Sequence, residues 1–209
     1  MLYQRRVRGW RCMKFNVVLV GVGGQGVLTL GKIIGKAALL EGYEVFVSEI
    51  HGLAQRGGSL LVQVRFGDKI TSPLISPGEA DLMIALEAIE ALRYAYYLTE
   101  EPTIVMNKTV IPPPLTEFKL NFEDIVKLIR QHVKNPRIYT VNATDIVLKI
   151  GLPQAVNTVV LGATVGAGVL PLKMENVTKA LEYVLKKKAL EKNLEAFELG
   201  KKSLTMLPQ

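Results

Sequence analysis

Apolar residues in this chain fall into short continuous runs, separated by longer stretches with helical spacing. The runs are rich in branched side chains, which is typical of buried strands; they lie at 16–20, 43–48, 60–66, 80–86, 103–106 and 137–141. The stretches with apolar positions three or four residues apart predict helices; they lie at 27–40, 87–98, 122–132, 142–150, 153–170 and 174–204. Because strands and helices alternate, we expect an α/β fold with a mostly parallel, Rossmann-like sheet flanked by helices.

The pattern also suggests how the chain is divided. The run 60–66 alternates between apolar and polar positions, and the turn signal Gly67-Asp68 after it predicts a return strand at 69–74. No repeat or internal linker interrupts residues 13–209, so we expect a single domain that ends in a helical tail from about residue 174. Residues 1–12 precede it as a basic leader. This leader is either a disordered extension from a start codon placed too early, or an arm that binds RNA, an anionic surface or a partner.

Positive charge is concentrated at the two ends of the chain. The 209 residues carry a formal net charge of +7, but residues 13–184 hold as many acidic as basic side chains. The leader contributes Arg5, Arg6, Arg8 and Arg11, and the rest of the excess lies in the lysine-rich tail. The charge therefore does not indicate nucleic-acid binding by the body of the protein, and we expect no nucleic-acid partner there. An RNA-binding or scaffold role through the basic ends stays open as an alternative.

The counts of cysteine and histidine exclude several kinds of site. Cys12 is the only cysteine, and His51 and His132 are the only histidines. A disulfide framework and a four-thiolate zinc or iron–sulfur site within this chain are therefore impossible. No apolar stretch is long enough for a membrane span, and no signal-peptide pattern follows the basic leader. We expect a cytoplasmic protein with no membrane partner and no metal site of its own.

A glycine-rich loop joins the first predicted strand to the first predicted helix. Its sequence, Gly21-Val22-Gly23-Gly24-Gln25-Gly26, matches G-x-G-x-x-G in the strand-to-helix context that the motif requires. Glycines let the backbone approach a ligand, and free N–H groups at a helix start attract phosphate. Glu49 follows at a spacing suited to the ribose of a dinucleotide, so a stand-alone NAD(P)-binding protein is one alternative. A tight turn needed only for packing is another.

A second glycine loop follows the next strand and argues for a larger anionic ligand. It runs from Glu49 to Ser59 and includes Gln55, Arg56 and two adjacent glycines. The carboxyl ends of parallel strands lie at one edge of a sheet, so both loops are expected to face one cleft. Arg56 suits a phosphate, and Gln55 and Ser59 are further hydrogen-bond donors. His51 in the same loop suits a structural hydrogen bond as well as a functional role.

Together, the segments GVGGQGVLTLGKIIGKAA, SEIHGLAQRGGSLLVQVRFG and SPLI resemble the gamma-type subunit of 2-oxoacid:ferredoxin oxidoreductases. The form SEIHGLAQRGGS is most similar to the small subunit of the indolepyruvate-type enzymes, and the resemblance spans residues 13–185. Members of this family are heteromeric enzymes of anaerobes. They convert a 2-oxoacid, CoA and oxidised ferredoxin into acyl-CoA, CO2 and reduced ferredoxin. The resemblance therefore implies oxidative decarboxylation of arylpyruvates in amino-acid fermentation.

The resemblance also implies how the work is divided between subunits. A large alpha subunit carries thiamine diphosphate with Mg and the [4Fe-4S] clusters, and ferredoxin accepts the electrons. The gamma-type chain contributes to the CoA site and has no catalytic residues of its own. The matching positions for the CoA phosphates are Gly21, Val22, Gly23, Gly24, Gln25, Gly26, Gln55, Arg56 and Asn157. For Asn157, an amide on a helix surface is the alternative.

Small residues also recur along the predicted helix at 153–170. They are Gly162, Ala163, Gly166 and Ala167, at a spacing that places them close together on one helix. Such residues allow the backbone of another segment to approach closely. The sequence leaves open whether that segment belongs to the same chain or to another subunit.

Overall fold

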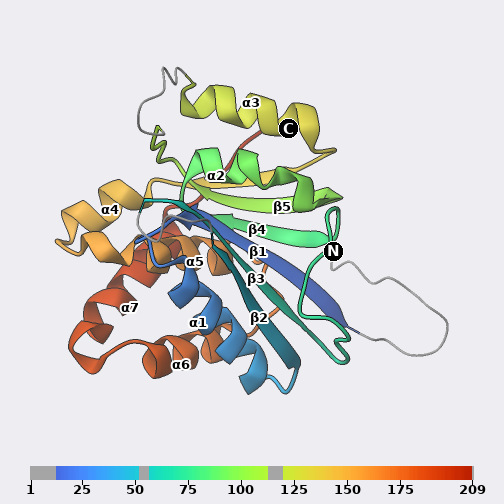
Figure 1. Ribbon diagram of the computed structural model, residues 1–209. Helices are drawn as coiled ribbons and strands as arrows, with labels where there is room; N and C mark the ends of the chain where they lie inside the picture. Colours follow the sequence, from blue (N-terminus) through green and yellow to red (C-terminus); the bar gives the residue numbers. More distant parts are fainter. Residues whose placement is uncertain (1–12, 52–56, 113–119, 209) are drawn as a thin grey trace.

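A computed structural model describes residues 13–51, 57–112 and 120–208 (Figure 1). The strands are β1 (Lys14–Val22), β2 (Glu44–His51), β3 (Ser59–Gly67), β4 (Ala80–Ala85), β5 (Leu98–Asn107), β6 (Arg137–Val141) and β7 (Thr205–Met206). The helices are α1 (Val27–Leu40), α2 (Ala88–Arg93), α3 (Phe122–His132), α4 (Ala143–Lys149), α5 (Val156–Gly166), α6 (Met174–Val184) and α7 (Lys187–Lys202), with short 3-10 turns η1 (Ala95–Tyr97) and η2 (Pro153–Ala155). The leader, residues 1–12, lies outside the described residues.

The strands form one sheet in the order β2-β3-β1-β4-β5-β6-β7. The pairs β1–β4, β4–β5 and β5–β6 are parallel, which confirms the expected mostly parallel α/β fold. The expected unit of strand, helix and strand from β1 through α1 to β2 is present, but its two strands are not neighbours. Strand β3 lies between them and pairs antiparallel with both.

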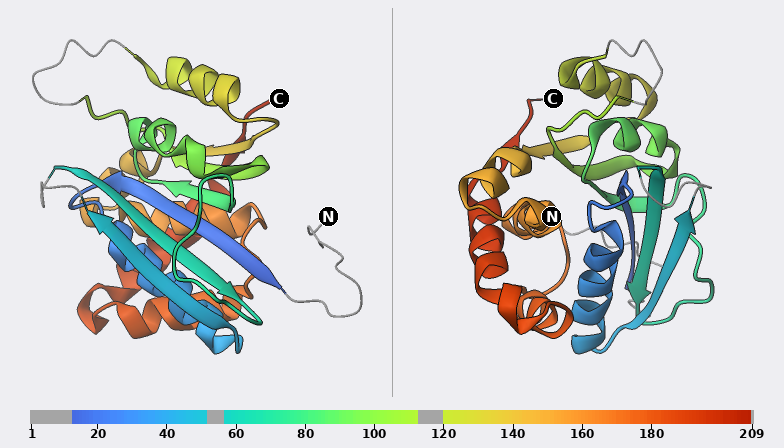
Figure 2. Two further views of the ribbon diagram at one scale, coloured as in Figure 1. Left: turned by 45° about the vertical axis from the view of Figure 1, so that its right-hand side comes forward. Right: turned by 60° about the vertical axis from the view of Figure 1, so that its left-hand side comes forward.

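Helices cover both faces of the sheet, as the two views in Figure 2 show. Alternate residues of β1 point to opposite faces, because successive side chains of a strand alternate. Val17 and Leu19 join the larger core, to which α1, α4, α5, α6 and α7 contribute. Val18 and Val20 join the smaller core, beneath α2 and α3. Within the described ranges, no helix is long and apolar enough to cross a membrane.

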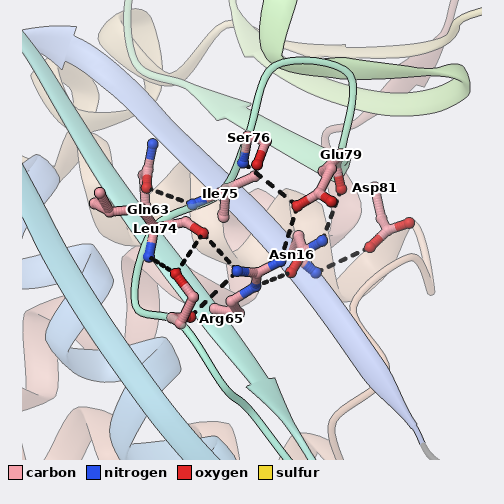
Figure 3. Close-up of polar contacts among 9 residues, drawn as sticks. Asn16, Gln63, Arg65, Leu74, Ile75, Ser76, Glu79 and Asp81 are labelled. Atoms are coloured by element: carbon pink, nitrogen blue, oxygen red, sulfur yellow. Dashed lines mark hydrogen bonds and ion pairs between the residues drawn. The ribbon is translucent and has the colours of Figure 1, made fainter.

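The segment 68–79 does not form the expected return strand; that prediction is wrong. It crosses the face of the sheet, held by polar side chains that point outward from β3 and β1 (Figure 3). Arg65 donates to Asn16 Oδ1 at 2.9 Å, to Glu79 Oε2 at 2.9 Å and to the carbonyl of Ser72 at 3.2 Å. Gln63 Oε1 accepts from the backbone N–H of Ile75 at 2.9 Å. The polar positions of the alternating strand are therefore buried under a covering segment, with Arg65 only 5% exposed.

The helical tail differs from the single long helix that its spacing predicts. Helix α6 ends at Val184, and the extended conformation of Leu185 and Lys186 lets α7 turn back along α5. The two helices approach closely because glycines face backbone across the contact. A Cβ at Gly162 would lie 2.0 Å from the carbonyl oxygen of Phe197, and one at Gly200 would lie 2.0 Å from that of Val159. The small residues of α5 thus serve packing within this chain.

The helix expected at 87–98 is also shorter than predicted. Helix α2 ends at Arg93, the turn η1 follows, and β5 already begins at Leu98. The helix predicted from Pro153 begins as the turn η2 and becomes α-helical at Val156. This later start places the N-terminus of α5 near the first glycine loop.

Candidate functional site

The first glycine loop lies at the topological switch point of the sheet, where successive strands are added on opposite sides of β1. After β1 the chain passes through α1 to β2 on one side, and later returns to β4 on the other side of β1. The N–H of Leu86 donates to the carbonyl of Val20 at 2.9 Å, so the carboxyl ends of β1 and β4 stay together. In open α/β sheets, ligands bind in the crevice at such a switch point. The loop predicted from the sequence therefore lies where this fold places ligands.

The loop conformation depends on glycine at two positions. Gly24 has φ 105° and Gly26 has φ 83°, both in the region that side chains disfavour. Gly26 is also the N-cap of α1 and provides no side-chain cap. The N–H groups in the first turn of a helix have no partner within the helix, and the helix dipole places positive potential there. The start of α1 is therefore suited to an anion.

The side chain of Gln25 supports the loop from within. Its Oε1 accepts from the backbone N–H of Val22 at 2.8 Å, and its Nε2 donates to the carbonyl of Leu86 at 3.4 Å. A Cβ at Gly21 would lie 2.8 Å from that Oε1, so glycine is needed there to let the side chain fold back. Gln25 thus connects the first loop to the end of β4. Its polar atoms are engaged in the protein, and its side chain braces the loop.

Asn157, which is distant in sequence, lies against the same loop. It stands in the first turn of α5, is 5% exposed, and its Nδ2 donates to the carbonyl of Gly26 at 3.2 Å. A Cβ at Gly26 would lie 2.6 Å from this Nδ2. Helix α5, like α1, begins without a side-chain cap. The structure thus brings two helix N-termini together, and the alternative of a surface amide at Asn157 is wrong.

The two glycine loops meet, as expected from their strands. The N–H of Gly23 donates to the carbonyl of Gly58 at 2.8 Å, and the N–H of Gly57 donates to the carbonyl of Gly23 at 3.4 Å. Gln55 and Arg56 lie outside the described residues, as does the side chain of His51. Ser59, which we expected to point to a ligand, instead bonds through its hydroxyl to Glu90 and Tyr94.

Two buried polar residues that the sequence did not single out close the site beneath the loops. Asn107, at the end of β5, donates to the carbonyl of Leu86 at 3.2 Å and accepts from the N–H of Ala143 at 3.0 Å. Glu87 accepts at 2.8 Å from the N–H groups of Ile111 and Glu90. Desolvation by burial raises the pKa of Glu87 above its ordinary value. The signal available in the sequence was a polar residue directly after an apolar strand.

The dinucleotide alternative does not have its usual geometry here. In that arrangement, the acidic residue stands at the end of a strand paired directly with the first strand. Here β3 separates β2 from β1, and Glu49 pairs with Val62 of β3. Among residues 13–51, 57–112 and 120–208, no three His, Cys, Asp or Glu side chains gather in a way that could hold a metal ion.

Comparisons with known proteins agree on one family. The family model of pyruvate ferredoxin/flavodoxin oxidoreductases matches residues 16–203. The indolepyruvate oxidoreductase subunit IorB of Archaeoglobus fulgidus is 43% identical over 190 residues, covering 90% of this chain and 94% of that protein. That of Pyrococcus horikoshii is 34% identical over 194 residues, covering 91% and 96%.

Solved structures share the fold. The pyruvate oxidoreductase subunit PORC of Thermotoga maritima superposes with a TM-score of 0.69 at 22% identity, covering 93% of this chain and 99% of that one. A 2-oxoglutarate:ferredoxin oxidoreductase from Magnetococcus marinus, solved with 2-oxoglutarate, coenzyme A and succinyl-CoA bound, gives a TM-score of 0.69 at 19% identity. It covers 90% of this chain but only 30% of that longer chain.

Proposed function

The chain belongs to the pyruvate ferredoxin/flavodoxin oxidoreductase family, and from that premise we propose that it is the small subunit of an indolepyruvate:ferredoxin oxidoreductase. In this proposal the complex converts arylpyruvates to aryl-acetyl-CoA and CO2, and this chain contributes to the binding of CoA. The resemblance of its near relatives over nine-tenths of the chain supports the substrate class. The geometry of the two glycine loops supports the role of this chain in CoA binding.

One observation carries the assignment of the CoA site. The first glycine loop, the start of α1 and the start of α5 converge beside the switch point, joined by the bond from Asn157 to Gly26. A pyrophosphate needs several N–H donors and positive potential close to the backbone. The start of α1 would supply both, and the start of α5, where Asn157 Oδ1 already accepts from the N–H of Thr158 at 2.9 Å, would add to the potential. The backbone of Gly21 to Gly26 would lie along the phosphates. Gln25 would hold the loop in shape from behind.

The second loop would complete this surface. Gly57 and Gly58 bond to Gly23, so the described end of the second loop lies against the first loop. Arg56 would supply a charged donor for a phosphate, and Gln55 a neutral one.

The remaining chemistry would belong to a larger subunit. With one cysteine, this chain cannot provide the thiolates of a four-cysteine cluster. We therefore place the [4Fe-4S] clusters on the partner, and the family resemblance implies that thiamine diphosphate and Mg lie there too, with ferredoxin as the acceptor of the complex. These groups would supply carbanion stabilisation and single-electron transfer. The part of this chain would be to bind and orient CoA and to exclude water, in a reducing, cytoplasmic setting.

Steady-state kinetics of the reconstituted two-subunit enzyme test this proposal. Gly26→Ala puts a side chain at φ 83° and against Asn157, at the centre of the site. Gly42→Ala is the matched control, because it imposes the same strain at φ 87° at the far end of α1, with nothing within 4 Å. We expect Gly26→Ala to raise the KM for CoA about tenfold or more, and Gly42→Ala to leave it unchanged. Equal effects of the two variants would refute the site.

Arg56→Ala tests the second loop in the same assay. We expect it to raise the KM for CoA more than the KM for the 2-oxoacid, because a guanidinium near a phosphate acts mainly on that ligand. An unchanged KM for CoA would remove Arg56 from the site.

The alternatives make different predictions. A dinucleotide-binding protein would be stabilised against heat by NAD and not by CoA, the reverse of our expectation for the complex. An RNA-binding protein would bind RNA through its basic ends, and deletion of residues 1–12 would weaken that binding. Copurification of a larger, cysteine-rich chain that binds thiamine diphosphate would support the proposed assembly directly.

A further inference from the structure

A buried carboxylate lies at the base of the two glycine loops. Glu90 of α2 is 5% exposed, and both of its oxygens have partners. Its Oε1 accepts from Arg93 Nε at 3.1 Å, and its Oε2 accepts from the hydroxyl of Ser59. Burial of a carboxylate is costly unless it is paired and hydrogen-bonded. Arg93 of α2 provides one partner of Glu90, and the other comes from a different part of the chain. Its partner Ser59 lies outside α2, 31 residues away in sequence.

Ser59 is the residue at which the second glycine loop enters the sheet. It is the first residue of β3 and stands opposite Val22 of the first loop in the register of β1 and β3. Its hydroxyl also lies 2.8 Å from that of Tyr94, one helical turn after Glu90. If Ser59 donates to the carboxylate, Tyr94 donates to Ser59, so the hydroxyl is held from both sides. The adjacent residue Gly58 accepts the N–H of Gly23.

We propose that Glu90 is a positioning residue that holds the second glycine loop against the first, so that it acts on CoA binding without contacting CoA. The inference rests on the proposed function, since it assigns Glu90 to the same site. A displacement of Ser59 would move the carbonyl of Gly58, which fixes Gly23. Glu90 itself is unsuited to be a ligand, because its charge repels phosphate and its oxygens are already engaged with Ser59 and Arg93.

Two variants weaken or remove the contact between Glu90 and Ser59. Glu90→Gln keeps the shape but loses the charge, and Ser59→Ala removes the hydroxyl. Hydrogen bonds to charged groups are among the stronger ones in proteins, so we expect each variant to raise the KM for CoA about tenfold in the reconstituted enzyme. We expect kcat and the KM for the 2-oxoacid to stay within about twofold. Ser59→Thr keeps a hydroxyl, and we expect its KM for CoA to stay close to the wild-type value.

Two controls separate positioning from general damage. Glu100→Gln removes an exposed carboxylate whose partner is Lys134, and it should change nothing. Ile125→Val loosens the smaller core without touching the loops, so it gives the kinetic effect of lost stability alone. Hydrogen exchange of the peptide containing Gly23 in the intact complex gives a second readout. We expect Glu90→Gln to speed it and Ile125→Val to leave it close to the wild type.

The outcomes separate the inference from the function on which it rests. If Gly26→Ala raises the KM for CoA but Glu90→Gln and Ser59→Ala do not, Glu90 has no positioning role and the CoA site stands. If the Glu90 and Ser59 variants change every kinetic constant as Ile125→Val does, the contact is structural only, and the inference fails. If none of these variants, Gly26→Ala included, affects the KM for CoA, the proposed function itself is wrong.

Discussion

The contact between α5 and α7 provides a sharp test, because two glycines there face backbone. In Gly162→Ala the new Cβ would start 2.0 Å from the carbonyl oxygen of Phe197, against at least 3.4 Å for an ordinary contact. The helices must separate by more than an ångström, since a backbone carbonyl cannot turn aside as a side chain can. Overpacking costs about 1–3 kcal/mol and occasionally more, and we place this case at the upper end, ~3 kcal/mol.

The net effect is smaller, because alanine favours the helix by about 1 kcal/mol relative to glycine. We therefore expect Gly162→Ala to lower the free energy of unfolding by ~2 kcal/mol. For a chain of this length, that corresponds to a fall in Tm of about 4–8 °C, measured by circular dichroism. Gly35→Ala in α1 is the control. Its Cβ would meet only the methyl groups of Val47 and Val45 on the edge strand, so its Tm should stay close to the wild type or rise.

Two results would refute this reasoning. A Gly162→Ala variant as stable as Gly35→Ala would mean that α7 does not approach α5 as closely as described. A variant with normal stability alone but weakened assembly with the larger subunit would mean that the small residues of α5 line a subunit interface. That second outcome is the alternative that the sequence left open.

Three further predictions concern the polar contacts. Arg65→Met leaves the carbonyl of Ser72 and the other acceptors of Arg65 unsatisfied, so urea unfolding should show a free energy of unfolding lower by ~3 kcal/mol. Arg65→Lys should not rescue it, and a loss below about 1 kcal/mol would contradict the prediction. Asn157→Ala should recover ~1 kcal/mol of the stability lost in Gly26→Ala, because it removes the clash but not the strain; strict additivity in the double-mutant cycle would contradict it. Burial raises the pKa of Glu87 above 4.5, so folding favours its protonated form. The stability that the protonated form contributes is complete below pH 4.5 and is lost as pH rises through the pKa of the folded state. Glu87→Gln should lack that decline, and Tm curves against pH that run parallel for both proteins would contradict the assignment.

The elements whose pattern is local were predicted well. Helices α1 and α3 and strand β6 have the bounds that their apolar spacing and turn residues indicate. The covering segment 68–79 could not be predicted, because an alternating strand with Gln63 and Arg65 has the same pattern whether water or another segment lies above it. The partner of Arg65 is set by tertiary contact, and Glu79 lies beyond a turn that the local sequence reads as a hairpin.

In the candidate site, too, the local sequence predicts some features, while tertiary contacts determine others. The first glycine loop is a local motif, and its place at the end of β1 followed from the strand and helix around it. The contact of Asn157 with Gly26 joins residues 131 positions apart, and only the resemblance to a family pointed to it. Glu87, Glu90 and Asn107 were missed because their roles depend on which strands are neighbours. A polar residue after an apolar strand is visible in the sequence for Glu87 and Asn107, but it does not show which strands will lie beside it.

The position of β3 explains why two glycine loops meet in this fold. If β2 paired directly with β1, as in a dinucleotide-binding unit, the loop after β2 would lead away and an acidic residue at its strand end would face the ligand. Here β3 lies antiparallel between the two strands, so the route of the chain into β3 starts beside the end of β1, with Ser59 opposite Val22. That route brings Gly57 and Gly58 onto Gly23, and it brings the hydroxyl of Ser59 to Glu90 of α2. In the proposed CoA site, the inserted strand would thus put a second glycine loop where a dinucleotide-binding unit has a ribose-binding carboxylate.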